Sequence, residues 1–243
     1  MENIGDGMKS VKTRIIRIEG DPSSEKSANW CWQTSAINTN IKMFKAVVPD
    51  EVDELMKSLR IEWKYPWVGE RTDINSGLVL RAYQTADPKK RMACFLSHYC
   101  LWEETIRSGE PLLILEHDAM FKSKKPIPLD DILKSKYDII GINEPFRATR
   151  KSQEFHEKIQ NDHFCRNGVV RAPLIDDVKT PQGIAGNSAY IITASGADKM
   201  VKLTKEHGAW PNDALMCRQL IFSLGVTKEY YTKTQNTRST TTL

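Results

Sequence analysis

The chain has 243 residues, of which 40% are hydrophobic and 27% are charged, and its formal net charge is +4. This length predicts one domain spanning 1–243 with a full core, and the lack of any run of eighteen apolar residues argues against a membrane-spanning helix. Five cysteines without a C-x-x-C pair and a polar start at 1–10 suit a cytoplasmic protein without a signal peptide. The charge permits a phosphate-rich partner, but it falls below the basicity typical of dedicated nucleic-acid-binding proteins.

In the first ninety residues, apolar runs typical of strands alternate with helix signals. The run over 11–18 predicts the first strand, and Asp21, followed by proline and two serines, predicts a turn and a helix start. A second strand is expected at 44–48. Asp50 then caps a helix whose apolar residues follow i, i+3, i+4 and i+7 spacing. The segment 61–90 is irregular.

The middle of the chain continues this alternation. A helix is predicted over 97–108, where Gly109 ends it. The apolar run beginning at Leu112 reads as a strand buried on both faces, and 137–142 forms another. The polar stretch 143–180 contains few apolar anchors, which predicts a loop or lid.

Further strands and helices are expected near the C-terminus. A strand at 189–193 precedes a helix that begins at Ser195 and ends at His207, and a second helix is predicted over 213–224. A short strand at 229–232 leads into a flexible tail, 234–243. Strands that alternate with helices predict an α/β fold, with a mainly parallel central sheet flanked by helices.

Two acidic residues directly follow the most apolar predicted strand. Burial would disfavour their charged side chains at this position. Glu116 and Asp118 come directly after Leu115, with His117 between them. In open α/β sheets, ligands bind at the carboxyl ends of the strands. Carboxylates are suited to Mn²⁺ or Mg²⁺, which complete their shells with water and substrate phosphate. The alternative is a capping acid beside a solvated neighbour, because an acid-x-acid pair is common.

Four sequence runs together resemble glycosyltransferase family 25. They are Ala93–Trp102 (ACFLSHYCLW), Leu112–Phe121 (LLILEHDAMF), Gly186–Ala197 (GNSAYIITASGA) and Trp210–Asp213 (WPND). The family pattern has a cysteine before LSH, a Trp-bearing helix, LILEDD before an apolar residue and Phe, a GTxAYIIS segment and a later PxD. The order and approximate spacing agree over a little more than half of the chain.

The resemblance implies a GT-A-like, Rossmann-type fold and transfer of a sugar from a nucleotide-sugar donor to a hydroxyl, with inversion. It also implies that Glu116 and Asp118 hold a divalent metal, Mn²⁺ or Mg²⁺. Such a cation offsets the charge that develops on the leaving nucleotide diphosphate. The sequence departs from the family at His117, which replaces an acid, and in 19–27, where an Arg-rich loop is replaced by a segment with only Lys26.

The resemblance also suggests residues that contact the donor. Ser97 and His98 would face the donor diphosphate from a helix N-terminus, although Ser97 also reads as a simple N-cap. Arg91 is a candidate phosphate partner, or else a solvated arginine. His117 is assigned to the same donor and cofactor site.

Two carboxylates compete for the role of general base, which deprotonates the acceptor hydroxyl. Asp213 is the first candidate, and Glu144, after the strand 137–142, is the second. A capping role is the alternative for Asp213. A zinc site is not expected in the polar segment 143–180. Its potential ligands lack the sequence spacing of known zinc sites; they are His156, His163 and Cys165.

The acceptor stays open at this stage. The family default is a terminal sugar on a surface, lipopolysaccharide-type saccharide; the alternative is hydroxymethylpyrimidine in phage DNA. DNA remains a possible acceptor because the sequence contains a group of lysines, namely Lys122, Lys124, Lys125, Lys134 and Lys136. A non-catalytic GT-A-like binding module would be expected to lose the acid pair, which this chain keeps. A metal-dependent phosphohydrolase would add further Asp and His ligands.

Overall fold

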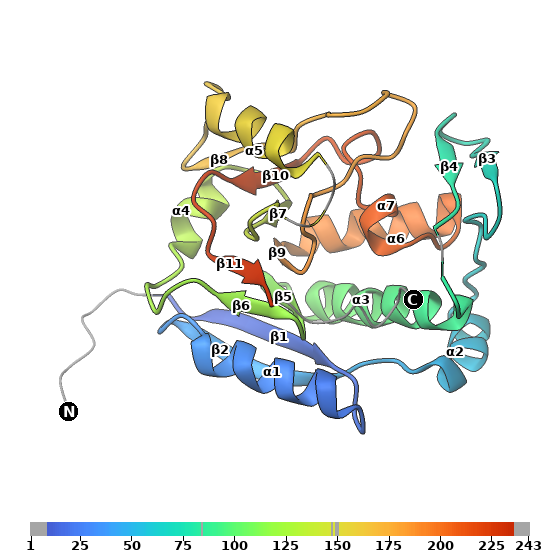
Figure 1. Ribbon diagram of the computed structural model, residues 1–243, viewed down its shortest axis with the longest axis horizontal. Helices are drawn as coiled ribbons and strands as arrows, with labels where there is room; N and C mark the ends of the chain where they lie inside the picture. Colours follow the sequence, from blue (N-terminus) through green and yellow to red (C-terminus); the bar gives the residue numbers. More distant parts are fainter. Residues whose placement is uncertain (1–8, 84, 147, 149–150, 236–243) are drawn as a thin grey trace.

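The computed structural model describes residues 9–83, 85–146, 148 and 151–235 (Figure 1). The strands of its main sheet are β1 (Val11–Arg17), β2 (Thr39–Lys45), β5 (Leu112–Glu116), β7 (Ile139–Gly141), β8 (Val169–Arg171), β9 (Ala189–Ile192) and β10 (Leu224–Thr227). In this part of the chain these seven strands follow the order β2-β1-β5-β9-β7-β10-β8. Two small antiparallel pairs lie beside the sheet, β3 (Glu70–Thr72) with β4 (Val79–Arg81) and β6 (Ala119–Phe121) with β11 (Thr232–Thr234).

Most strands of the main sheet run in one direction. β1 is parallel to β2 and β5, and β7 is parallel to β10. β9 is antiparallel to both β5 and β7, so the two parallel groups point the same way, while β8 is antiparallel to β10. The carboxyl ends of β1, β2, β5, β7 and β10 therefore share one edge with the amino end of β9. The expected α/β architecture with a mainly parallel sheet is confirmed.

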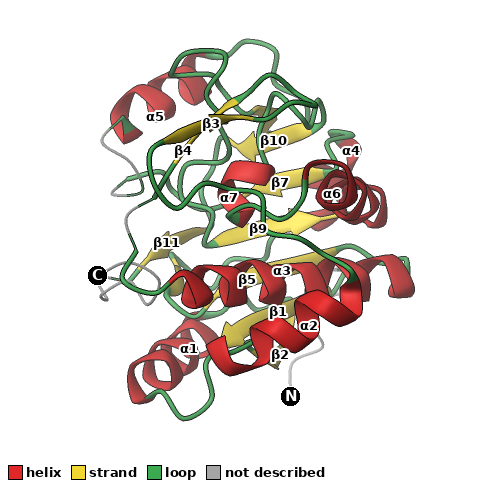
Figure 2. Ribbon diagram, turned by 90° about the vertical axis from the view of Figure 1, so that its right-hand side faces the viewer, coloured by secondary structure: helices red, strands yellow, loops and turns green. Residues whose placement is uncertain are grey.

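Helices cover both faces of this sheet. The described helices are α1 (Pro22–Thr34), α2 (Val52–Leu59), α3 (Pro88–Ser108), α4 (Leu129–Lys134), α5 (Ser152–Asn161), α6 (Ala194–His207) and α7 (Asn212–Leu215), with a short 3₁₀ turn at Pro49–Glu51. α3 and α6 pack side by side on one face, which Figure 2 views with α2 in front of β1. α1 and α4 contribute to the core on the other face.

β5 explains why the sequence places an apolar run before the acids. Leu112 and Ile114 belong to the core cluster beneath α3 and α6, whereas Leu113 and Leu115 belong to the cluster beneath α1 and α4. All four side chains are buried. Because alternate residues of a strand point to opposite faces, both sets must be apolar until the strand reaches the open edge at Glu116.

The helix predicted at 97–108 begins earlier, at Pro88. Asp87 caps α3 by accepting a hydrogen bond from the backbone N–H of Lys89, and Pro88 fits the first helical turn because it needs no N–H donor there. Gly109 ends the helix with a φ of 68°, as expected for a C-terminal glycine. Ser97 and His98 therefore lie inside the helix, and the prediction that they form its N-terminus is wrong.

Three other element boundaries also differ. The second strand occupies Thr39–Lys45 rather than 44–48, and the last strand occupies Thr232–Thr234 rather than 229–232. The helix predicted over 213–224 stops at Leu215 as the short α7, and the chain then turns before it enters β10. Most of the tail predicted at 234–243 lies outside the described residues.

The stretch 143–180 contains more regular structure than a loop. α5 buries Phe155 and Ile159 against the core, and β8 extends the main sheet at its edge. The polar composition reflects an amphipathic helix whose other face is exposed. Long irregular segments remain on either side of β8.

Candidate active site

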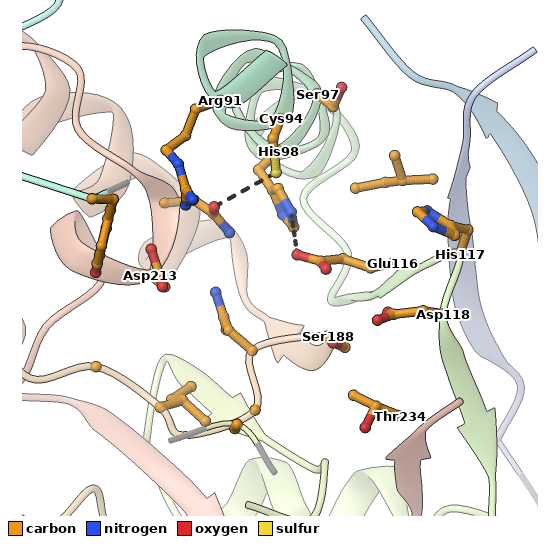
Figure 3. A pocket seen from close by; sticks show the side chains of 18 of the residues that line it. Arg91, Cys94, Ser97, His98, Glu116, His117, Asp118, Ser188, Asp213 and Thr234 are labelled. Carbon is orange, nitrogen blue, oxygen red and sulfur yellow. Dashed lines mark hydrogen bonds and ion pairs between the residues drawn. The ribbon is translucent and has the colours of Figure 1, made fainter. Parts of the chain in front are cut away.

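One large cavity opens at the carboxyl edge of the main sheet. Its volume is about 1100 Å³, and it is bounded by the segments that follow β1, β2 and β5, by α3 and by the segment that precedes β9. This is the position at which open α/β sheets bind ligands. Figure 3 shows the cavity with side chains from α3 and from the end of β5 pointing into it.

Glu116 and Asp118 both reach this cavity. Glu116 is the last residue of β5, Asp118 lies in the turn before β6, and the two side chains point into the same space (Figure 3). Burial, and then the charge of Glu116, raise the pKa of Asp118 to about 7. Asp118 Oδ1 is buried and has no hydrogen-bond partner among the described residues. A divalent cation fits here, because it would compensate this buried oxygen and the crowded negative charge.

His98 contacts Glu116 from the neighbouring helix. Its Nε2 lies 3.3 Å from Glu116 Oε1, and its Nδ1 lies 2.8 Å from the hydroxyl of Tyr190 on β9. The indole N–H of Trp102 donates to the same hydroxyl at 2.9 Å. Cys94 lies one helical turn before His98, and ligand atoms of Cys94, His98 and Glu116 all lie within 4.8 Å of one another.

Ser97 has a structural role. Its hydroxyl donates to the carbonyl of Ala93 at 2.9 Å and accepts from the backbone N–H of Val47 at 2.9 Å. The bond from Val47 ties α3 to the segment after β2, and the bond to Ala93 lies within the helix. Ser97 lines the cavity, but it does not present a helix N-terminus to a phosphate.

His117 lies on the cavity wall, between the two acids in sequence. Burial lowers the pKa of its imidazole, although the charges of Glu116 and Asp21 oppose this effect. The ring is therefore biased toward its neutral form at neutral pH. His117 thus adds no full positive charge next to the acid pair.

Arg91 and Asp213 line another part of the cavity (Figure 3). The guanidinium of Arg91 lies 4.8 Å from the centre of the Tyr83 ring. Burial raises the pKa of Asp213, while Arg91 lowers it and Glu116 adds to the rise. Asp213 therefore combines a basic carboxylate with access to the cavity, as a general base requires.

Glu144 is placed differently. Among the described residues that line the cavity, Glu144 is not present. Its carboxylate forms an ion pair with Lys122 at 3.1 Å. The structure therefore does not bring Glu144 together with Asp213 and the acid pair.

Residues outside the predicted set also face the cavity. The side-chain amide of Asn187 is buried, and neither its nitrogen nor its oxygen has a hydrogen-bond partner in the described part of the chain. Ser188 hydrogen-bonds Asp118, which lowers the pKa of that carboxyl. Both residues lie in the GNSAYII run, and this position in a family motif was the feature of the sequence that could have identified them as cavity residues. The motif alone gives no role for their polar side chains.

The residues considered for zinc do not form a cluster. His156 Nδ1 lies 3.0 Å from the hydroxyl of Tyr230, and Cys165 is exposed. Within the described ranges, the grouped metal-ligand side chains are those of Cys94, His98 and Glu116.

Comparisons with known proteins give a family and a distant structural neighbour. Residues 23–216 match the sequence profile described as Glycosyltransferase family 25 (LPS biosynthesis protein). No curated protein matches the chain. Among solved structures, the crystal structure of mouse xyloside xylosyltransferase 1 in its apo form superposes with a TM-score of 0.37 and 7% sequence identity, covering 89% of this chain and 81% of that one.

The match extends over most of the chain, including the cavity-lining part of α3, the acid pair and Asp213. None of the described helices is both long enough and apolar enough to cross a membrane. The matched range contains all four sequence runs. The chain belongs to glycosyltransferase family 25.

Proposed function

We propose that this glycosyltransferase moves a sugar from a nucleotide-sugar donor to a saccharide hydroxyl, with Glu116 and Asp118 holding a divalent cation, Mn²⁺ or Mg²⁺. The observation that carries this proposal is the buried, unpartnered Oδ1 of Asp118 beside a second carboxylate. A buried carboxylate oxygen beside a second carboxylate, at the ligand-binding edge of the sheet, is disfavoured unless a cation offsets the charge.

The cation would offset the negative charge that develops on the leaving nucleotide diphosphate. The protein's own groups then have separate tasks. Glu116 and Asp118 supply oxygen ligands, and Arg91 is a candidate partner for donor phosphate oxygens because a guanidinium can bind them in a bidentate manner. The unpartnered amide of Asn187 is suited to a polar group of the donor.

Asp213 is the proposed general base. A single displacement with inversion needs a carboxylate that removes the acceptor's proton as the new glycosidic bond forms. The raised pKa of Asp213 increases its basicity. Glu144 is less suited, since it pairs with Lys122 and does not line the cavity described above.

The proposed acceptor is a neutral saccharide of the lipopolysaccharide type. The lysines that favoured DNA are partly engaged within the protein: Lys122 pairs with Glu144, and the ammonium of Lys124 donates to the carbonyl of Gln33. The Glu144 carboxylate offsets the charge of Lys122, and the bond to Gln33 occupies one N–H of Lys124, so both are less available to a phosphate backbone. A cytoplasmic location, where nucleotide sugars are made, is part of this proposal.

The test is release of nucleoside diphosphate from a panel of nucleotide sugars. We expect turnover of at least one donor with Mn²⁺ or Mg²⁺ and its loss in excess EDTA. Asp118→Ala should abolish it, while Asp131→Ala, which changes an exposed acid on α4, should retain it. Full turnover in EDTA, or in Asp118→Ala, would contradict the metal site.

A further inference from the structure

A continuous chain of hydrogen bonds leads from the buried core to Glu116. It begins at the indole N–H of Trp102, passes through the Tyr190 hydroxyl to Nδ1 of His98, and continues from His98 Nε2 to Glu116 Oε1. The side chains of Trp102, Tyr190 and His98 are completely buried, and that of Glu116 is 30% exposed. The chain therefore connects the rigid interface between α3 and β9 to the cavity.

The hydrogens in this chain can be assigned by counting donors and acceptors. The indole nitrogen of Trp102 can only donate, so the Tyr190 oxygen accepts that bond. The hydroxyl proton of Tyr190 then needs an acceptor, and His98 Nδ1 at 2.8 Å is the group within reach. His98 therefore accepts at Nδ1 and carries its proton at Nε2, where it donates to the Glu116 carboxylate.

The other protonation states of His98 leave a group unsatisfied. With the proton on Nδ1, the ring would donate to Tyr190, and the tyrosine proton would have no acceptor among the described residues. Nε2 would also present a lone pair to the Glu116 carboxylate, which is repulsive. A doubly protonated ring would again leave the Tyr190 proton unpaired. A buried donor without a partner loses the hydrogen bond that it makes to water in the unfolded chain, which disfavours both states.

This assignment bears on the cluster of Cys94, His98 and Glu116. A metal bound to Nε2 of His98 would require the proton to move to Nδ1, which breaks the match with Tyr190. The Cys94 thiol also has a partner, because Sγ lies 3.9 Å from the side-chain oxygen of Asn212. The cluster is thus arranged to orient Glu116 rather than to bind a soft metal.

We infer that His98 is a positioning residue: held in its Nε2–H tautomer by Tyr190 and Trp102, it donates to one oxygen of Glu116 and so orients the other oxygen toward the cation. This inference rests on the proposed function, because it assumes that Glu116 is a metal ligand. Histidines and carboxylates that hydrogen-bond metal ligands fix the ligands' orientation, and their loss typically weakens metal binding about 10- to 100-fold.

The first test reads the tautomer directly in the metal-free protein. Long-range ¹H–¹⁵N correlation spectra distinguish Nε2–H from Nδ1–H imidazoles, and the His98 signal among the chain's five histidines is the one missing in His98→Gln. We expect a fixed Nε2–H tautomer in the wild type and a mixture of tautomers in Tyr190→Phe. An Nδ1–H tautomer in the wild type overturns the inference.

The second test measures Mn²⁺ affinity by calorimetry, without a donor. We expect His98→Leu to bind Mn²⁺ roughly 10- to 100-fold more weakly. His98→Gln should recover part of this loss because its amide N–H can replace Nε2–H. The matched control is His156→Gln, which alters the contact between His156 of α5 and Tyr230. His156 is not among the described residues that line the cavity, so this variant should bind Mn²⁺ like the wild type. Thermal melting confirms that each variant is folded.

The outcomes separate this inference from the proposed function. Equal Mn²⁺ affinity in the wild type, His98→Gln and His98→Leu would overturn the positioning role and leave the metal site intact. Absence of Mn²⁺ binding by the folded wild type would overturn both. Co²⁺ provides an independent check, since a thiolate-to-cobalt charge-transfer band that disappears in Cys94→Ser would place the metal on the cysteine cluster and contradict the inference.

Discussion

The carboxylates of Glu116, at the end of the buried strand β5, and Asp118, two residues later, point into the same cavity. There the charge of Glu116 opposes ionisation of Asp118. Burial contributes more to this opposition than the neighbouring charge, and together they raise the pKa of Asp118 from 3.8 to about 7. The protein therefore holds an unfavourable charge in this cavity at neutral pH. A ligand that binds only the folded protein and offsets this charge would stabilise it.

The first prediction concerns stability in EDTA. Between the unfolded pKa of 3.8 and the folded pKa of about 7, the folded protein binds more protons at Asp118 than the unfolded chain does. The free energy of unfolding therefore falls as pH rises through this window. Asp118→Asn removes this loss, and we expect its Tm at about pH 8 to exceed that of the wild type by roughly 2–4 °C for each kcal/mol recovered.

Three controls make this prediction specific. The Tm difference should shrink as pH falls toward about 4, where the wild-type carboxyl is protonated in the folded state. Saturating Mn²⁺ should reverse the order, because it stabilises the protein that binds it. Asp131→Asn, which changes an exposed acid of α4, should show neither effect. A Tm difference independent of pH would contradict the charge-based explanation.

The second prediction concerns Asp213. If this carboxylate removes the proton from the attacking hydroxyl, Asp213→Asn should lower kcat about 10²- to 10⁴-fold with little change in donor KM. Release of nucleoside diphosphate to water should fall as well, since water uses the same base. Because the pKa of Asp213 is raised, wild-type kcat should decline on the acidic side, where the base becomes protonated.

The matched control for this variant is Asp198→Asn. Asp198 lies on α6 and pairs with Lys202 at the surface, so its loss should leave kcat within about twofold of the wild type. A wild-type kcat in folded Asp213→Asn would show that another group acts as the general base.

The third prediction concerns the segment 143–180, which forms part of the cavity wall. Phe155 of α5 and Ile175 line the cavity, and both belong to this segment. Donor bound in the cavity would contact them, and surface segments of this kind commonly close over substrate. We expect slower proteolysis within 151–180 when nucleotide sugar and Mn²⁺ are both present than with either alone. Identical cleavage rates under all conditions would rule out ordering by the donor.

The acid pair was predictable because it depends on one strand. An apolar run buried on both faces must end at the sheet edge, so the positions of Glu116 and Asp118 follow from the sequence alone. The contact of His98 with Tyr190 was not predictable in this way. It joins α3 to an antiparallel strand 92 residues later, and sequence spacing does not specify which strands become neighbours.

Local signals also competed with each other. Asp87-Pro88 starts α3, whereas Ser97 carries a second capping signal within the same helix, which predicts a start nine residues too late. The predicted length of the helix after Asp213 is wrong for a different reason. The residues from Met216 onward turn to reach β10, and tertiary packing of Leu215, Cys217 and Ile221 decides that path rather than helix propensity.

The last prediction separates a saccharide acceptor from DNA. A protein that binds DNA neutralises phosphates with lysine and arginine, and contact with six or more phosphates lowers affinity about a thousandfold or more between about 50 and 200 mM salt. Recognition of a neutral sugar rests on short-range hydrogen bonds and stacking, so salt should affect it only slightly. Since Lys122 pairs with Glu144 and Lys124 donates to Gln33, we expect no salt-sensitive binding of a labelled duplex that contains hydroxymethylpyrimidine.

The decisive variant replaces Lys122, Lys124 and Lys125 with alanine. Under the saccharide proposal it should retain donor turnover and sugar transfer, because these side chains do not belong to the described cavity lining. If DNA is the acceptor, the same variant should flatten the salt dependence of duplex binding and reduce transfer to hydroxymethylated DNA while donor hydrolysis continues. Tight binding of the duplex by the wild type at low salt, lost in this variant, would replace the saccharide with DNA as the acceptor.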